Sequence, residues 1–161
     1  MDIAFVGIYA VVLIYLITTK RTELLKYLLL SSAIGLIWVL LGKNMYAYNH
    51  NYLSIAGLST YPLFGWSLGL FAMQLLFLKL KKIFGTTGFA KDFLLFTITY
   101  TVLLIAAETI FYHAFNIHDI ATAGNTAIPF CDCMHSPNWM KAVYFGMGPI
   151  YFLIIETKKP A

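Results

Sequence analysis

The residue best placed for chemistry is a carboxyl inside a long apolar run. Glu108 follows Ile105-Ala106-Ala107 and precedes Thr109-Ile110-Phe111. An ionised carboxyl at such a depth in a membrane helix is costly unless it is paired or solvated. Glu108 must therefore be neutral, be paired, or face a water-filled cavity. Residues that follow one another at spacings of three, four or seven share one helical face. Such spacings join Glu108 in series to Thr97, Thr101, Tyr112 and Phe115.

Two interpretations of this carboxyl are open. In the functional one, Glu108 is a general acid, or an anion that stabilises a cationic intermediate, and His113 and Asp132 are secondary acid–base groups. In the structural one, Glu108 forms an ion pair with Lys141 or a hydrogen bond with Tyr144. Ionisable residues inside membrane segments are functional by default, so the sequence favours the first interpretation.

A second reactive group follows in the stretch Cys131-Asp132-Cys133-Met134-His135. Cys131, Cys133 and His135, together with His118, offer thiolate and imidazole ligands that suit zinc or copper. The spacing matches neither a zinc-ribbon pair nor a haem-attachment motif. Thiol–disulfide exchange and a structural role, as a disulfide or as two packed thiols, therefore stay open beside metal binding.

Aromatic side chains gather at those ends of the apolar runs that are expected to lie at the outer leaflet. An aromatic belt at the membrane interface is their ordinary explanation. The density of asparagine and histidine among the rings also suits a pocket for an extended apolar ligand or a carbocation, which the ring faces attract. The candidate substrate-binding residues are Trp38, Tyr46, Tyr48, Asn49, Tyr112, Trp139 and Tyr144.

Trp38 is followed by Tyr46-x-Tyr48-Asn49-x-x-Tyr52 and then by an apolar run with Pro62. This stretch, from about residue 38 to residue 80, resembles the repeat of the integral-membrane lycopene-cyclase family. The paired glutamates that follow the proline in that family are absent, because Leu63-Phe64-Gly65-Trp66 comes next. An acid for such chemistry would have to come from Glu108 in another span.

The composition is typical of a membrane protein. Of the 161 residues, 60% are hydrophobic and 11% are charged, whereas a soluble domain carries about 25% charged residues. Only helices and closed barrels satisfy their backbone in lipid, and the continuous apolar runs favour helices. We expect one all-α integral membrane domain over residues 1–161, a bundle of five transmembrane helices. The predicted spans are 3–19, 24–42, 58–80, 93–115 and 139–155.

Small residues predict how these helices pack. Ser31-x-x-x-Gly35 and Gly65-x-x-x-Gly69 have the spacing that lets helix backbones approach closely. The stretch Gly146-Met147-Gly148-Pro149 predicts a kink in the last span.

The basic residues predict the orientation. With five spans, all of the 11 lysines and arginines except Lys43 and Lys141 fall on one side. The positive-inside rule places that side in the cytoplasm. The N-terminus is then outside and the C-terminus cytoplasmic, and the histidines and cysteines after Glu108 lie at the outer face.

These features predict a small multi-pass protein of a plasma or inner membrane that contacts the lipid bilayer. Its expected function is acid–base chemistry at Glu108 on a lipophilic substrate, such as an isoprenoid or a lipid. One alternative is a non-catalytic subunit or a carrier of a metal or small molecule, which uses Cys131-x-Cys133-x-His135 and docks a membrane protein or a second copy of itself. Another is a membrane thiol oxidoreductase. Motifs for phosphate or nucleic-acid binding are absent from the sequence.

Overall fold

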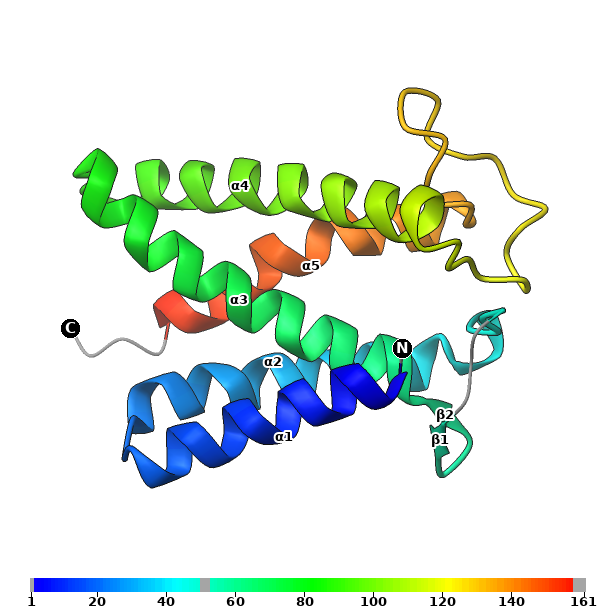
Figure 1. Ribbon diagram of the computed structural model, residues 1–161. Helices are drawn as coiled ribbons and strands as arrows, with labels where there is room; N and C mark the ends of the chain where they lie inside the picture. The colour runs from blue at the N-terminus through cyan, green and yellow to red at the C-terminus, as the bar shows by residue number, and fades with distance from the viewer. Residues whose placement is uncertain (1, 50–52, 158–161) are drawn as a thin grey trace. The chain divides into compact units, whose positions relative to one another are not determined.

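The structure is a computed structural model, which describes residues 2–49 and 53–157 (Figure 1). It is mostly helical, and the five predicted helices are present. The chain forms two compact units, Met1–Ala72 and Met73–Ala161. Tyr52, which belongs to the stretch that resembles the lycopene-cyclase repeat, lies outside the described residues.

The first unit contains α1 (Asp2–Thr18), α2 (Thr22–Leu41) and the beginning of α3 (Thr60–Phe84). The hydroxyl groups of Tyr9 in α1 and Ser32 in α2 share a hydrogen bond of 2.8 Å. A β-carbon at Gly35 would lie 3.1 Å from Ser67 Oγ of α3, so α2 and α3 approach closely there, as predicted. At Gly65 and Gly69 a β-carbon would meet no atom within 4 Å, so the second small-residue spacing does not mediate such an approach.

The loop between α2 and α3 has its own short elements, η1 (Lys43–Met45), β1 (Ser54–Ile55) and β2 (Leu58–Ser59). The strands pair antiparallel, with Ile55 opposite Leu58. Gly57 at the turn has φ of 77°, a conformation that glycine adopts without cost. Because Leu58 and Ser59 belong to this hairpin, α3 begins at Thr60 and not at residue 58.

The second unit contains the rest of α3, then α4 (Phe89–Thr109), the π-helical turn η2 (Ile110–Ala114) and α5 (Asn138–Thr157). We call residues 115–137, which connect η2 to α5, the cap. Figure 1 shows the cap at the end of α4, beside the start of α5. The rings of Phe77, Phe96 and Phe152 form the core, with centroids 5.2 to 5.6 Å apart.

Helix α4 is apolar on two opposite faces. Its buried face follows one row of residues four apart, namely Asp92, Phe96, Tyr100 and Leu104. The opposite face carries large exposed side chains at the same spacing, namely Leu94, Ile98 and Val102. A helix that is apolar all round is typical of a core or a membrane span. Since Leu94, Ile98 and Val102 are exposed, lipid is the environment that suits them.

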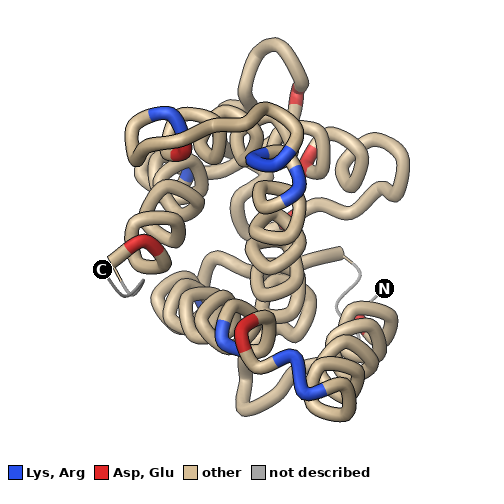
Figure 2. The backbone as a smooth tube through the Cα atoms, turned by 90° about the vertical axis from the view of Figure 1, so that its left-hand side faces the viewer, with Lys and Arg blue, Asp and Glu red and all other residues tan. Residues whose placement is uncertain are grey.

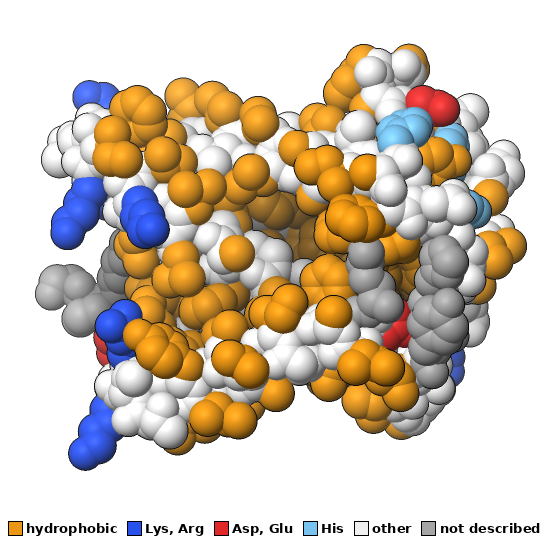
Figure 3. Space-filling view, in the orientation of Figure 1, with side chains coloured by type: hydrophobic (Ala, Val, Ile, Leu, Met, Phe, Trp, Pro, Cys, Tyr) orange, Lys and Arg blue, Asp and Glu red, His pale blue; other side chains and the backbone are white. Residues whose placement is uncertain are grey.

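Within residues 2–49 and 53–157, three helices are long and apolar enough to cross a membrane, and they indicate that the protein associates with one. They are Thr22–Leu41, Thr60–Phe84 and Phe89–Ala114, the last of which joins α4 to η2. Helix α1 is apolar but has only 17 residues. In Figure 3, apolar side chains cover most of the visible helix surface, and basic side chains lie at the helix ends.

Helix α4 begins at Phe89, earlier than the predicted residue 93. The additional turn contains Lys91 and Asp92, which the prediction excluded because they are charged. Asp92 is tolerated inside the unit because its carboxylate binds the Lys81 ammonium and accepts a hydrogen bond of 2.7 Å from the Thr86 hydroxyl. The first turn of α4 is therefore anchored to the end of α3.

Candidate functional site

Glu108 lies in the last turn of α4, where it continues the buried row of that helix. It follows Leu104 by four residues and is half-buried. Among the described residues, its carboxyl makes no hydrogen bond and no ion pair. The predicted structural ion pair with Lys141 is wrong, because the Lys141 ammonium binds the carbonyl and hydroxyl oxygens of Thr126 in the cap. The predicted hydrogen bond with Tyr144 is not formed either.

The polar strip predicted around Glu108 is only partly assembled. Thr97 and Thr101 are half-buried, and Thr97 Oγ1 is a buried atom without a hydrogen-bond partner. Tyr112 is half-buried, whereas Phe115 is exposed. The reason is the turn η2, which interrupts the α-helical spacing after Thr109. Phe115 N donates to Ile110 O at 3.3 Å, five residues back, so the helix widens there and the face that holds Glu108 shifts.

This widened turn presents the side chains that follow Glu108. It contains Tyr112 and His113. Single π-turns are frequent at functional sites, because they aim side chains that a regular helix would point elsewhere. No sequence pattern predicts the π-helical turn, since Ile110-Phe111-Tyr112-His113 is typical of an ordinary apolar α-helix.

Three imidazoles surround the Tyr112 ring. The centroids of His113, His118 and His135 lie 5.1, 5.7 and 4.8 Å from the centroid of Tyr112. His135 comes from the far end of the cap, so the cap folds back over η2. The structure thus brings together three histidines that the sequence separates by up to 22 residues (135 − 113).

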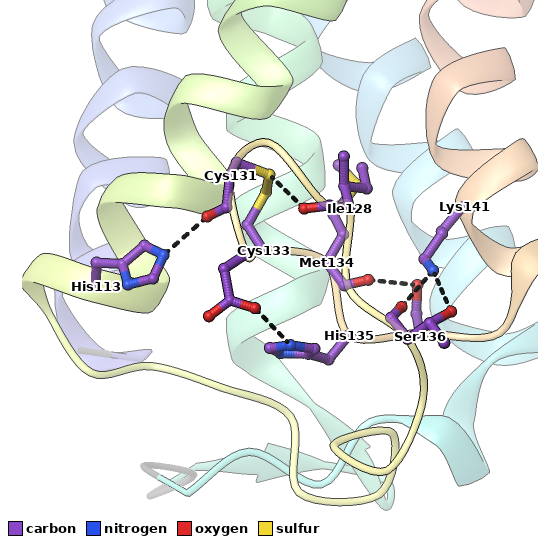
Figure 4. A network of polar contacts seen from close by, with 10 residues as sticks. His113, Ile128, Cys131, Cys133, Met134, His135, Ser136 and Lys141 are labelled. Atoms are coloured by element: carbon purple, nitrogen blue, oxygen red, sulfur yellow. Dashed lines mark hydrogen bonds and ion pairs between the residues drawn. A yellow bond between two sulfur atoms is a disulfide. The ribbon is translucent and has the colours of Figure 1, made fainter.

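Figure 4 shows the polar contacts that hold this cluster. His113 Nε2 lies 2.9 Å from the Cys131 carbonyl oxygen. His135 Nε2 lies 3.4 Å from Asp132 Oδ1, with 17% of the His135 side chain and 72% of the Asp132 side chain exposed. Asp132, a candidate acid–base residue, is therefore in contact with solvent, whereas its imidazole partner is largely enclosed.

Cys131 and Cys133 are joined in a disulfide. Two backbone hydrogen bonds to the Ile128 carbonyl, from Cys131 N at 3.2 Å and Asp132 N at 2.9 Å, close the same turn. Asp132 and Met134 have φ of 45° and 54°, a left-handed conformation that costs a non-glycine residue about 1 to 3 kcal/mol. The turn is thus held in an unfavourable backbone conformation by the bonds around Cys133.

The predicted metal site has no support. Zinc and copper sites of the expected kind need thiolates, and both sulfurs are bonded to each other. Across residues 2–49 and 53–157, no group of three or more histidine, cysteine or acidic side chains is placed to hold a metal ion. Neither His118 nor His135 gains a cysteine as a co-ligand in this arrangement.

The predicted aromatic residues of the first unit do come together. Trp38 Nε1–H donates to the Tyr46 hydroxyl, and the Tyr46 ring stacks on Tyr48 at 5.8 Å. Tyr48 meets Tyr61 edge to face at 4.7 Å. Asn49 follows Tyr48 directly in the same loop. These rings form a continuous aromatic cluster at one end of α2 and α3, in which Trp38 and Tyr46 are buried.

The remaining candidates in the second unit play different parts. Trp139, in the first turn of α5, is half exposed. Tyr144 is buried, and its carbonyl accepts a hydrogen bond from the Tyr100 hydroxyl. Tyr100 itself was not singled out from the sequence, although its spacing of eight residues from Glu108 and Asp92 places all three on one row.

Comparisons with protein-family models, with curated proteins and with solved structures found no match to this chain.

Proposed function

We propose that this protein is a multi-pass membrane enzyme that acts on a lipophilic substrate, an isoprenoid or another lipid, by acid–base chemistry at Glu108. The observation that carries the proposal is the unpaired Glu108 carboxyl, at the end of a buried row and one turn before three clustered imidazoles. An ionisable group inside a membrane segment is energetically costly, and such groups are by default functional.

The proposal places five spans in the membrane, with the N-terminus outside and the C-terminus in the cytoplasm. Figure 2 marks lysine and arginine positions on the backbone near the turns between helices, and Lys79, Lys81, Lys82 and Lys91 lie within 13 residues (79–91) on either side of the α3–α4 turn. The cap lies at the other end of α4. If α4 crosses the membrane, the positive-inside rule puts the α3–α4 turn in the cytoplasm and the cap outside.

Each group has a definite role in this scheme. Glu108 donates a proton to the substrate, or stabilises a cation that forms on it. The imidazoles of His113 and His135 exchange protons with solvent, His135 through its contact with the exposed Asp132. The aromatic cluster of the first unit, in which Trp38 and Tyr46 are buried, is assigned no step in this scheme.

Lipid analysis of membranes tests this function. Cells that express the wild-type protein should accumulate a lipophilic product, or lose its precursor, and cells that express Glu108→Gln should not. Glu23→Gln is the matched control, because Glu23 is exposed and pairs only with Lys26. Equal lipid profiles for wild type and Glu108→Gln, at equal amounts of folded protein, would end the proposal.

A second candidate function, thiol–disulfide exchange, is favoured by the disulfide itself. Cys131 is half-buried, whereas Cys133 is fully buried, so an incoming thiolate reaches the Cys131 sulfur and releases the Cys133 thiol. A substrate dithiol would be oxidised to its disulfide while Cys131 and Cys133 are reduced to two thiols. A membrane quinone would then accept the two electrons and two protons and re-form the bond.

Thiol alkylation followed by mass measurement decides this second function. The purified protein should gain two alkyl groups after incubation with a dithiol and lose that reactivity after addition of a quinone. A bond that stays closed throughout would exclude exchange and leave the acid–base proposal intact.

A further inference from the structure

The end of the second unit opposite the cap contains a basic hollow. It has a volume of about 590 Å³ and is lined by the last turns of α3 and by the turn that follows, namely Leu78, Lys79, Lys81, Lys82, Gly85, Thr86 and Thr87. Three lysines and two threonines are therefore among the residues that line one concave surface. None of the chemistry proposed at the cap uses these residues.

Among the described residues, the charge of this hollow is only partly neutralised. Residues 79–92 contain four lysines and one acidic residue, Asp92, which gives 4 − 1 = +3. Asp92 is buried and binds Lys81, so its negative charge offsets the positive charge of Lys81. Among the described residues, Lys79 and Lys82 form no ion pair. They lie three residues apart, a spacing that places them on one face of α3.

The backbone of the turn adds hydrogen-bond donors. Gly88, the residue before α4, has φ of 98° and no side chain caps the first turn of α4. The first amide groups of a helix carry a partial positive charge that favours anions. The hydroxyl group of Thr86 already donates to Asp92, whereas that of Thr87, on the wall of the hollow, makes no hydrogen bond among the described residues.

Apolar side chains surround the same turn. Ile83 is 74% exposed, Phe84 is 63% exposed and Phe89 is 57% exposed. These residues end α3 and begin α4, two helices that are long and apolar enough to cross a membrane. A site with ammonium groups in a hollow and exposed aliphatic and aromatic side chains beside it matches a molecule with an anionic head and apolar chains.

We propose that the hollow binds the phosphate group of an anionic membrane lipid. Lys79 and Lys82 contact the phosphate oxygens, Thr87 donates its hydroxyl hydrogen, and Ile83 and Phe84 pack against the acyl chains. Asp92 holds Lys81 in the wall of the hollow and orders the turn. The site rests on the membrane placement proposed above but not on any chemistry at Glu108.

Lipid titration of the full-length protein in detergent tests the proposal. Phosphatidylglycerol should bind at one molecule per chain, as native mass spectrometry counts it, and phosphatidylcholine should not compete. The double variant Lys79→Gln/Lys82→Gln should bind phosphatidylglycerol roughly 30-fold more weakly, since each lysine near an anionic surface contributes a factor of about five. Circular dichroism spectra confirm that the variant keeps its helices.

Lys20→Gln/Arg21→Gln is the matched control, because it removes the same charge from the α1–α2 turn and should leave binding unchanged. Equal losses in the two double variants would reduce the interaction to general charge attraction and overturn the proposal.

Inorganic phosphate is titrated in a parallel arm. If it displaces the lipid at micromolar concentration, the ligand is a soluble phosphate and the lipid assignment is wrong. Because the titration needs no turnover, its failure leaves the enzyme proposal standing.

Discussion

The Tyr100 ring of α4 lies directly against Gly148 of α5. A β-carbon on Gly148 would overlap the ring, whose nearest atoms are Tyr100 Cγ, Cδ1 and Cδ2. The Tyr100 hydroxyl donates to the carbonyl oxygen of Tyr144, which lies one turn before Gly148 in α5. The two helices therefore approach closely at this point, and the contact sets the position of the row that ends in Glu108.

Gly148→Ala should destabilise the protein. The ring of Tyr100 is buried and its hydroxyl is bonded, so it cannot move aside freely, and overpacking of this kind costs about 1 to 3 kcal/mol. Thermal unfolding in detergent measures the loss. Gly146→Ala is the matched control in the same helix, since a β-carbon at Gly146 would meet no atom within 4 Å. Equal melting temperatures for the two variants would contradict the contact.

Substitution of Lys81 should lower the free energy of unfolding more than substitution of Asp92. The Asp92 side chain is 5% exposed and that of Lys81 is 35% exposed. Lys81→Met leaves a buried carboxylate without its cation and should cost about 3 kcal/mol. Asp92→Asn leaves an ammonium that can turn to water, and should cost about 1 kcal/mol. Denaturant unfolding of both variants measures the order, and a larger loss for Asp92→Asn would contradict it.

Removal of the disulfide should loosen the cap and little else. The bond links residues only two apart, and so short a loop contributes about 2 kcal/mol or less through chain entropy. In Cys131→Ser/Cys133→Ser, hydrogen exchange should speed up at the amides of Cys131 and Asp132, which bond to Ile128. Exchange in the middle of α4 should stay slow. Global unfolding of the variant would mean that the bond supports the whole unit.

The helices were predictable from the sequence because their cause is local. Long apolar runs bounded by Lys20-Arg21 or by Gly85-Thr86-Thr87-Gly88 admit few alternatives. The errors arose where tertiary contacts decide. Asp92 extends α4 because Lys81 comes from another helix, and Leu58 pairs in a hairpin and does not begin α3.

The candidate site was predictable as a set of residues but not as an arrangement. The kink near Pro149 stays a prediction, and the structure adds that Gly148 makes room for Tyr100 and that α5 extends past Pro149. The metal hypothesis treated Cys131 and Cys133 as thiolates, and only the fold of the cap shows them bonded. The partner of Lys141 is a cap carbonyl, which no side-chain pattern could reveal.

Chemical labelling of carboxyl groups is the most direct measurement of the central claim, which is that Glu108 is an unpaired carboxyl within the membrane. Dicyclohexylcarbodiimide reaches carboxyl groups from the lipid phase, and peptide mass spectrometry locates its adduct. The account predicts an adduct on Glu108, none on Asp92, which is bound to Lys81, and little reaction of Glu108 with a water-soluble carbodiimide. An unmodified Glu108, or one that the water-soluble reagent modifies as readily, would contradict the account.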